Sequence, residues 1–110
     1  MEVTFANAKI QKLCNSEKKL RGKYGPQASA IIMRRLLDLA AAGNLEEMRI
    51  LPGRCHELTG DLKGSLALDL KHPLRLIFEP NHDPRPQLAG GGLDWENVTR
   101  VTITAMLDYH

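Results

Sequence analysis

The side chains of this sequence that can do chemistry are mainly histidines and arginines in its middle and at its end. Histidine can give or take a proton near neutral pH, and the planar fork of arginine matches the oxygens of a phosphate group. His56 and Arg75 lie in runs of alternating residues, and Asp-Tyr-His occupies positions 108–110. Each also has an ordinary interpretation, in which Arg75 is a solvated charge beside Asp69 or Glu79 and His56 is a strand residue facing the core.

The other histidines and the two cysteines offer weaker chemistry. His72 and His82 lie in predicted turns and are expected to be exposed bystanders. Cys14 and Cys55 are expected to be reduced thiols, because nothing before them resembles an export signal. No CxxC or HxxxH spacing occurs, and Cys55-His56 is a poor zinc pair, so the sequence predicts no metal and no cofactor.

Composition is that of an ordinary globular domain. The chain has 110 residues, of which 43% are hydrophobic and 25% charged, so we expect one domain over residues 1–110. No apolar run has membrane-spanning length, and we therefore expect a cytosolic (cytoplasmic) protein with no membrane partner.

Positive charge is concentrated near the start of the chain. Residues 1–23 hold six Lys and Arg against two acidic residues, whereas residues 51–110 hold six against eight. Clustered cations displace counterions from phosphate backbones, so this asymmetry indicates a polyanionic partner, with a merely solvated helix face as the alternative.

The elements that must position these side chains are clearest in the middle of the sequence. Strands are predicted at residues 54–58, 65–70 and 74–78, from their period of two. Gly60, Gly64 and the His72-Pro73 pair stand where the chain must reverse. Alternation turns the leucines of these strands toward a core and turns Arg75 away from it. In a last strand at 99–109, it places Asp108 on the same face as Arg75.

The first half of the chain predicts helices. In chain order we expect an edge strand at 2–6, a helix from an Asn7 cap to Tyr24 with breaks at Gly22 and Gly25-Pro26, a helix at 26–42, and a helical turn at 45–51. Residues 81–92 are expected to form a mobile loop. The order of elements predicts an α+β fold, with the N-terminal strand and a two-helix hairpin packed on one face of an antiparallel sheet of four to five strands.

Three motifs carry a family resemblance. LTGDLKGSLALDL, LRLIFEP and the final DYH, in this order, resemble the HigB branch of the RelE/ParE toxin superfamily, the plasmid maintenance killer proteins. The likeness covers residues 45–110 by motif, and residues 1–44 only through one strand and two helices. It implies a RelE-like fold and a toxin of a type II toxin-antitoxin system. Such a toxin is a metal-independent, ribosome-dependent mRNA endonuclease, or mRNA interferase, that inhibits translation.

The resemblance also implies catalytic roles, position by position. RNA cleavage of this kind needs a base for the 2′-hydroxyl proton, an acid for the leaving 5′-oxygen and a cation on the phosphate. Either His56 or His110 would be the base and the other the acid, and Arg75 would hold the phosphate. Asp108 would orient a histidine, while Tyr109 would stack on a nucleobase or donate a hydrogen bond.

The implied partners are a ribosome with mRNA in the decoding site and a cognate helix-turn-helix antitoxin similar to HigA. The expected RNA-binding residues are Lys18, Lys19, Arg21, Lys23 and Lys63. Thr59 departs from the HigB pattern, which has lysine there. This departure keeps open an inactive toxin that only binds its antitoxin. A second alternative is a non-enzymatic binder of a protein target, like the ParE branch, which usually lacks the catalytic histidines.

Overall fold

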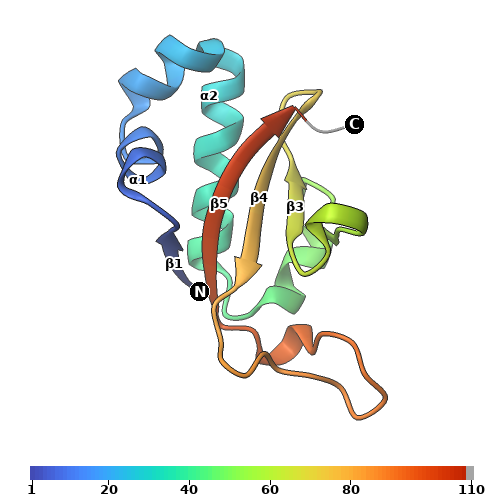
Figure 1. Ribbon diagram of the computed structural model, residues 1–110. Helices are drawn as coiled ribbons and strands as arrows, with labels where there is room; N and C mark the ends of the chain where they lie inside the picture. Colours follow the sequence, from blue (N-terminus) through green and yellow to red (C-terminus); the bar gives the residue numbers. More distant parts are fainter. Residues whose placement is uncertain (109–110) are drawn as a thin grey trace.

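The computed structural model describes residues 1–108, in which two helices cover one side of a five-stranded sheet (Figure 1). The strands are β1 (Glu2–Phe5), β2 (His56–Glu57), β3 (Leu66–Asp69), β4 (Leu74–Pro80) and β5 (Arg100–Asp108). The helices are α1 (Ala8–Cys14) and α2 (Glu17–Ala41), with short 3-10 helices η1 (Leu45–Ile50), η2 (Gly60–Leu62) and η3 (Trp95–Asn97). The predicted α+β class is confirmed.

The sheet is mixed, so the prediction of an antiparallel sheet is wrong at one edge. Its strand order is β1-β5-β4-β3-β2, and β1 pairs with β5 in parallel, with Val3 opposite Val101. The other neighbouring pairs are antiparallel. Alternation in the sequence assigns the faces of a strand but carries no information on the direction of a neighbour that lies about a hundred residues away.

The helices begin where side chains can cap them. Asn7 caps α1 as predicted, because its Oδ1 atom accepts from the main-chain nitrogen of Ile10 at 2.9 Å. The first helix ends earlier than expected, at Cys14, since the hydroxyl of Ser16 accepts from the Lys19 nitrogen and starts α2. Side-chain caps of this kind satisfy amide groups that have no partner inside the helix.

Of the two glycines expected to interrupt the helices, one does so. Gly25 has a φ of +86° and kinks α2, and Pro26 follows it at the start of the next helical stretch. Proline suits that position because its missing N–H is not needed there. Gly22 lies within the helical stretch before the kink, so the break predicted at that residue is wrong.

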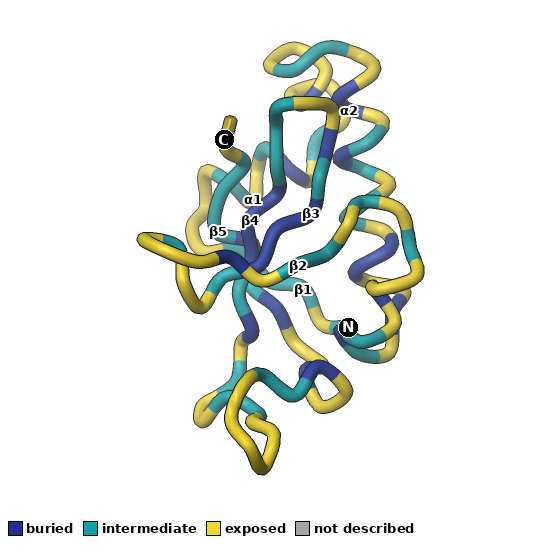
Figure 2. Tube along the Cα trace, turned by 90° about the vertical axis from the view of Figure 1, so that its right-hand side faces the viewer, coloured by how far each residue is buried: buried dark blue, intermediate teal, exposed yellow. Residues whose placement is uncertain are grey.

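The main core lies between the helices and the sheet. Leu66, Leu68, Leu76 and Phe78 are almost fully buried there, as the alternation in β3 and β4 predicts (Figure 2). The helices and β5 contribute further fully buried side chains to this core, among them Leu20, Ile32, Leu39, Val101 and Ile103. Burying such side chains is the main source of stability for a domain of this size.

The opposite face of the sheet has a smaller apolar cluster. Leu58, Ala67 and Ile77 are buried there, and Leu62 of η2 and Ala105 pack against them. The segment around η2 therefore covers part of the face that the helices leave uncovered (Figure 1). The rest of that face, which we call the open face, carries the polar residues of β3 and β4.

A β-bulge in β5 reverses the predicted alternation in the part of this strand that follows Thr104, up to Asp108. Ile77 lies opposite Ala105, but the next residue of β4, Phe78, lies opposite Ile103, so Thr104 is the extra residue. An extra residue turns all the following side chains to the other face. Beyond the bulge Leu107 lies opposite Arg75, and Asp108 lies opposite Leu74, which packs on the core. The expectation that Asp108 shares a face with Arg75 is therefore wrong.

The segment between β4 and β5 is tied to the sheet by a histidine. His82 was expected to be an exposed bystander, but its Nε2 atom accepts from the main-chain nitrogens of Thr99 (3.0 Å) and Arg100 (3.3 Å). Burial, and then the charge of Arg100, lower the pKa of His82. Within residues 81–92, expected to be a mobile loop, Gln87 forms an antiparallel bridge with Leu93.

The free energy of unfolding should therefore fall as the pH drops below about 6.5, the ordinary pKa of histidine. The unfolded chain then takes up a proton at His82 that the folded chain resists, and this favours the unfolded state. Urea unfolding between pH 7 and pH 5 measures the effect. His82→Gln should flatten this pH dependence, while His72→Gln, at an exposed turn, should leave it as in the wild type. Equal slopes in all three proteins would contradict the role of His82.

The turn at Gly53 requires a glycine, because of both its backbone conformation and the space around it. Its φ is +111°, and an added Cβ atom would lie 2.7 Å from Nε of Arg35 and 3.2 Å from Leu68. We expect Gly53→Ala to lower the free energy of unfolding by about 1–3 kcal/mol, from strain and crowding together. Gly22→Ala is the control, because its Cβ meets open space and should stabilise the helix by about 0.5–1 kcal/mol. Denaturant titration that finds the same sign for both would contradict this account.

Candidate functional site

The candidate site lies on the open face, at the end of β3 and the start of β4. Asp69 is its centre, because its carboxylate accepts from Nε of Arg54 at 2.9 Å and from Nη2 of the same residue at 3.4 Å. Nε of Arg75 lies 3.2 Å from Oδ1 of the same carboxylate, which also accepts from Nη2 of Arg54. Asp69 and Arg75 are directly opposite each other in the β3–β4 pair, so the sheet itself sets this contact.

His56 joins the same face from β2. It lies opposite Ala67, which is two residues before Asp69 in β3, and the residue as a whole is partly buried. The Nδ1 atom is 2.7 Å from the main-chain oxygen of Arg54. Since a carbonyl oxygen can only accept, Nδ1 must carry the proton, and Nε2 of the neutral ring is left as a proton acceptor.

The electrostatics of the site favour an ionised carboxylate. Burial alone would raise the pKa of Asp69, but the hydrogen bond from Arg54 and the charges of Arg54, Arg75 and His56 outweigh it and hold this pKa below its ordinary value. The two guanidinium groups place positive charge around the site. The geometry can therefore bind an anion and supply a base beside it.

The turn before β2 shapes the site. The strand predicted at 54–58 is reduced to His56–Glu57, because Gly53 and Arg54 both have positive φ values, of +111° and +49°. This turn directs the Arg54 carbonyl toward His56 while the Arg54 side chain reaches Asp69. The main-chain nitrogen of Asp69 also donates to the Gly53 oxygen at 2.7 Å, which holds the turn against β3.

The five expected catalytic residues do not all meet here. His56 and Arg75 lie on the open face around Asp69, as expected for Arg75. Asp108 is on the helix-covered face, where it lines a pocket of about 280 Å³ near the kink of α2. Tyr109 and His110 lie outside the described residues, so their roles stay predictions.

The structure adds two residues to the site. Asp69 appeared in the sequence analysis only as an ordinary partner for Arg75, and Arg54 was not singled out. Asp69 and Arg75 flank a predicted turn, a spacing that allows a cross-strand ion pair. Arg54 gives no such signal, since its contact with Asp69 depends on a left-handed residue whose conformation the sequence does not reveal.

The two cysteines are poor nucleophiles. Both thiols are unpaired. Burial raises the pKa of Cys14 to about 11 and, with the charge of Glu57, raises that of Cys55 to about 12 against the influence of Arg49. A thiol reacts as the thiolate, so neither is activated at neutral pH. Within residues 1–108, no three His, Cys, Asp or Glu side chains are grouped as metal ligands would be.

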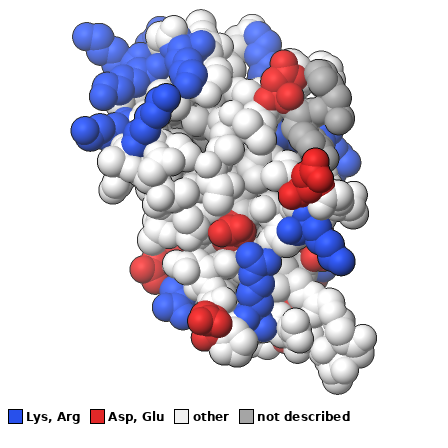
Figure 3. Space-filling view, in the orientation of Figure 1, with Lys and Arg blue, Asp and Glu red and all other residues white. Residues whose placement is uncertain are grey.

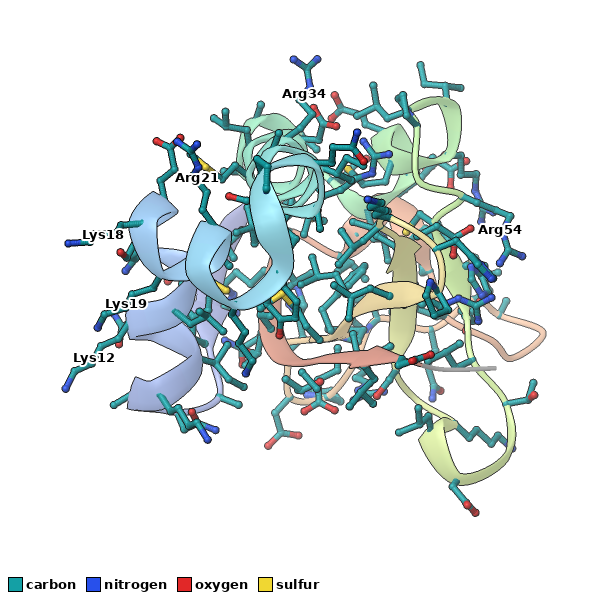
Figure 4. All side chains as sticks on the ribbon, turned by 90° about the horizontal axis from the view of Figure 1, so that it is seen from above. Lys12, Lys18, Lys19, Arg21, Arg34 and Arg54 are labelled. Carbon is teal, nitrogen blue, oxygen red and sulfur yellow. The ribbon has the colours of Figure 1, made fainter. Side chains whose placement is uncertain are left out.

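A second positive surface lies on the helical side. Lys and Arg side chains gather over α1 and the start of α2 (Figure 3). Lys12, Lys18 and Lys19 project outward on one side of the molecule, and Arg54 lies on the opposite side (Figure 4). We call Lys18, Lys19, Arg21 and Lys23 the basic cluster; all four are exposed. Arg21 lies 4.0 Å from Glu17, and Lys23 stands over the Tyr24 ring.

Lys63 belongs to neither positive surface. It follows η2 and lines a groove of about 490 Å³ between that segment and the loop after β4. Arg85 crosses this groove, donating to the Gly64 oxygen at 2.7 Å and pairing with Glu79 at 3.7 Å. The predicted RNA-binding residues are thus divided between two parts of the molecule.

Comparisons with protein-family models, with curated proteins and with solved structures found no match to this chain. The family resemblance therefore depends on the sequence motifs alone. Among the described residues, no helix has the length and apolar character needed to cross a membrane.

The neutral form of His56 should be protonated on Nδ1. This follows from the 2.7 Å contact with the Arg54 oxygen, which favours one of the two tautomers. The nitrogen-15 shifts of the imidazole above pH 8 report the tautomer directly, and we expect Nε2 to have the shift of an unprotonated nitrogen. His72, which is exposed, serves as the internal reference. A His56 ring protonated mainly on Nε2 would contradict this geometry.

Proposed function

We propose that this protein is the toxin of a type II toxin-antitoxin system and that it cleaves mRNA on the ribosome. One observation carries the proposal: a histidine with an acceptor nitrogen lies on the open face near Asp69, whose carboxylate pairs with a strand arginine, Arg75. The three sequence motifs support it independently. A base and a phosphate-binding cation are two of the three groups that RNA cleavage needs.

The chemistry we propose uses the 2′-hydroxyl of the mRNA as the nucleophile. His56 Nε2 takes the proton of that hydroxyl, and the 2′-oxygen forms a bond to phosphorus while the bond from phosphorus to the 5′-oxygen breaks. Arg75 neutralises the charge that develops on the phosphate oxygens. An acid returns a proton to the 5′-oxygen, and His110 is the proposed acid by family resemblance. The products are a 2′,3′-cyclic phosphate and a 5′-hydroxyl.

The ribosome supplies what this small site lacks. Among the described residues, Arg75 lines a small pocket of about 140 Å³ together with Asp69, His72 and their neighbours. In our proposal the decoding site positions the mRNA, and the basic cluster on the helical side binds ribosomal RNA through counterion release. Placement of the two positive surfaces on opposite sides supports simultaneous contact with both RNAs.

The antitoxin we propose is a helix-turn-helix protein that covers the open face. A cover there would shield His56 and Arg75 from RNA, and the positive charge around Asp69 suits acidic side chains of such a partner. A protein-target binder of the ParE type is the second candidate. The pairing of Arg75 with Asp69 favours it to some degree, since that ion pair needs no catalytic purpose.

Cleavage assays with purified ribosomes and mRNA separate these candidates. We expect His56→Ala to reduce the rate by about a hundredfold or more, the usual effect of losing an acid-base group. Arg75→Gln should lower it by a similar factor through lost charge stabilisation. Arg100→Gln is the matched control, because it removes an exposed cation from the far end of the same sheet. It should cut at the wild-type rate.

Other outcomes of this assay would count against the enzyme. Wild-type protein that binds ribosomes and never cuts mRNA would favour the inactive toxin, and protein that neither binds ribosomes nor cuts would favour the target binder. Undiminished cleavage by His56→Ala would remove His56 from the mechanism. Circular dichroism of each variant shows whether the fold is kept.

Ribosome affinity should depend on the basic cluster. Lys18 and Lys19 are exposed and lie side by side in the sequence, so replacing both with Gln should weaken binding and make the plot of log affinity against log salt less steep by about 1.4. A variant with Lys71 and Arg100 replaced by Gln loses the same charge elsewhere and should keep the wild-type slope. Equal slopes for the two variants would show that only net charge matters.

A further inference from the structure

Asp69 gathers guanidinium groups from three separate parts of the chain. Nε of Arg54 donates to its Oδ2 atom at 2.9 Å, and Nε of Arg75 lies 3.2 Å from its Oδ1 atom. Nε of Arg35, in α2, donates to the main-chain oxygen of Asp69 at 3.2 Å. Two guanidinium groups thus contact the Asp69 carboxylate and a third contacts the main chain of the same residue. Guanidinium groups held in fixed positions near one another are suited to binding an anion.

Arg54 is placed to meet a ligand. Its side chain is 62% exposed, against 25% for Arg75, although it is bound to Asp69 through both Nε and Nη2. One edge of the guanidinium is therefore fixed to Asp69 while the group as a whole remains at the surface. Arginine fixed in this way loses little freedom when it binds a phosphate.

The backbone of Arg54 connects this guanidinium to the histidine. Among residues 1–108, Arg54 is the one non-glycine residue with a positive φ, at +49°. Its carbonyl oxygen accepts from Nδ1 of His56 at 2.7 Å. Strained backbone of this kind is concentrated at functional sites. A single residue thus sets the tautomer of His56 with its main chain and presents a cation with its side chain.

From this geometry we infer that Arg54 and Arg75 together bind one phosphodiester group of single-stranded RNA, with Asp69 as the positioning residue between them. The inference rests on the proposed function and adds to it a second phosphate ligand and the group that spaces the two guanidiniums. Each arginine would offer N–H donors to a different oxygen of the phosphate, and Nε2 of His56 would lie beside the adjoining ribose.

A purely structural ion-pair network is the competing explanation for Arg54. Arg54→Gly separates the two, because glycine accepts the positive φ and keeps the carbonyl that binds His56. This variant removes the guanidinium alone. Arg54→Lys keeps the positive charge but loses the fork that binds two atoms at once.

The test is a titration without ribosomes. A 2′-O-methyl RNA trinucleotide, which lacks the attacking hydroxyl, is added to nitrogen-15-labelled protein, and the His56 ring and the arginine Nε signals are followed by NMR. We expect both His56 and Arg54 to shift in the wild type. Arg54→Gly should bind about tenfold or more weakly, as expected for a lost charge-assisted contact, and its salt slope should fall by about 0.7. Arg54→Lys should bind with intermediate affinity.

Three results would overturn the inference. They are wild-type affinity in Arg54→Gly, no shift of His56 or Arg54 at millimolar trinucleotide, and tighter binding of a glutamate-rich peptide than of the RNA in the same titration. The last would mark the site as one for protein carboxylates. If the protein binds the trinucleotide but does not cleave mRNA on ribosomes, the proposed function is contradicted and the binding site is not. If the protein cleaves mRNA but Arg54→Gly binds the trinucleotide as tightly as the wild type, the binding site is contradicted and the proposed function is not.

The positioning role of Asp69 can be tested by comparing RNA affinity with the cleavage rate in one variant. Asp69→Asn removes the negative charge between the arginines, so trinucleotide affinity should stay equal or rise. The maximal cleavage rate on ribosomes should fall at least tenfold, because the guanidiniums and His56 are no longer held in place. Weaker binding with an unchanged rate would show that Asp69 is not a positioning residue.

Discussion

The carboxylate of Asp69 is the contact on which the open face of this protein depends. It stands at the end of β3 and holds Arg75 of β4 and Arg54 of the turn before β2. The main chain of the same residue binds Arg35 of α2 and Gly53. Four parts of the chain thus meet at one residue, and the turn that orients His56 is one of them.

The contacts of Asp69 differ from an isolated ion pair, because two arginines contact one carboxylate. An isolated ion pair at a protein surface contributes little to stability, because water and salt screen it. Here one carboxylate contacts two arginines, so it holds two guanidinium groups close together on the open face. The arrangement places two guanidinium groups near a histidine, which is the basis of our functional proposal.

Sequence reasoning found much of the fold for identifiable reasons. The strict alternation of leucine in β3 and β4 located the core face and placed Arg75 on the other, and Asn7 gave the start of α1. Two features had no local signal. The parallel pairing of β1 with β5 joins residues about a hundred positions apart, and the bulge at Thr104 depends on how β5 fits against β4. Because the prediction did not include this bulge, it placed Asp108 on the wrong face of the sheet.

Two residues of the candidate site, His56 and Arg75, could be predicted from the sequence. Arg75 followed from alternation, and His56 from the family motif. Arg54 could not be found, because a left-handed arginine looks like any other loop residue in a sequence. The sequence thus located the strand positions of the site, while the turn that completes it emerged only from the three-dimensional structure.

The two positive surfaces give the molecule two sides with different tasks in our account. The basic cluster extends from the helices, while the Asp69 site lies on the open face of the sheet. A protein held by ribosomal RNA on its helical side would turn the other side toward the mRNA. In our proposal this division lets a site with a small pocket, of about 140 Å³, act on a specific bond, because the ribosome positions the mRNA.

The most direct measurement of the central claim is cleavage of mRNA with a single 2′-deoxyribose at the mapped cutting position, on purified ribosomes. The account requires attack by the neighbouring 2′-hydroxyl. The wild-type protein should therefore leave the deoxy-substituted mRNA uncut at that position and convert the unmodified mRNA into fragments with a 2′,3′-cyclic phosphate and a 5′-hydroxyl. Cleavage of the deoxy-substituted position, or fragments with a 5′-phosphate, would contradict it.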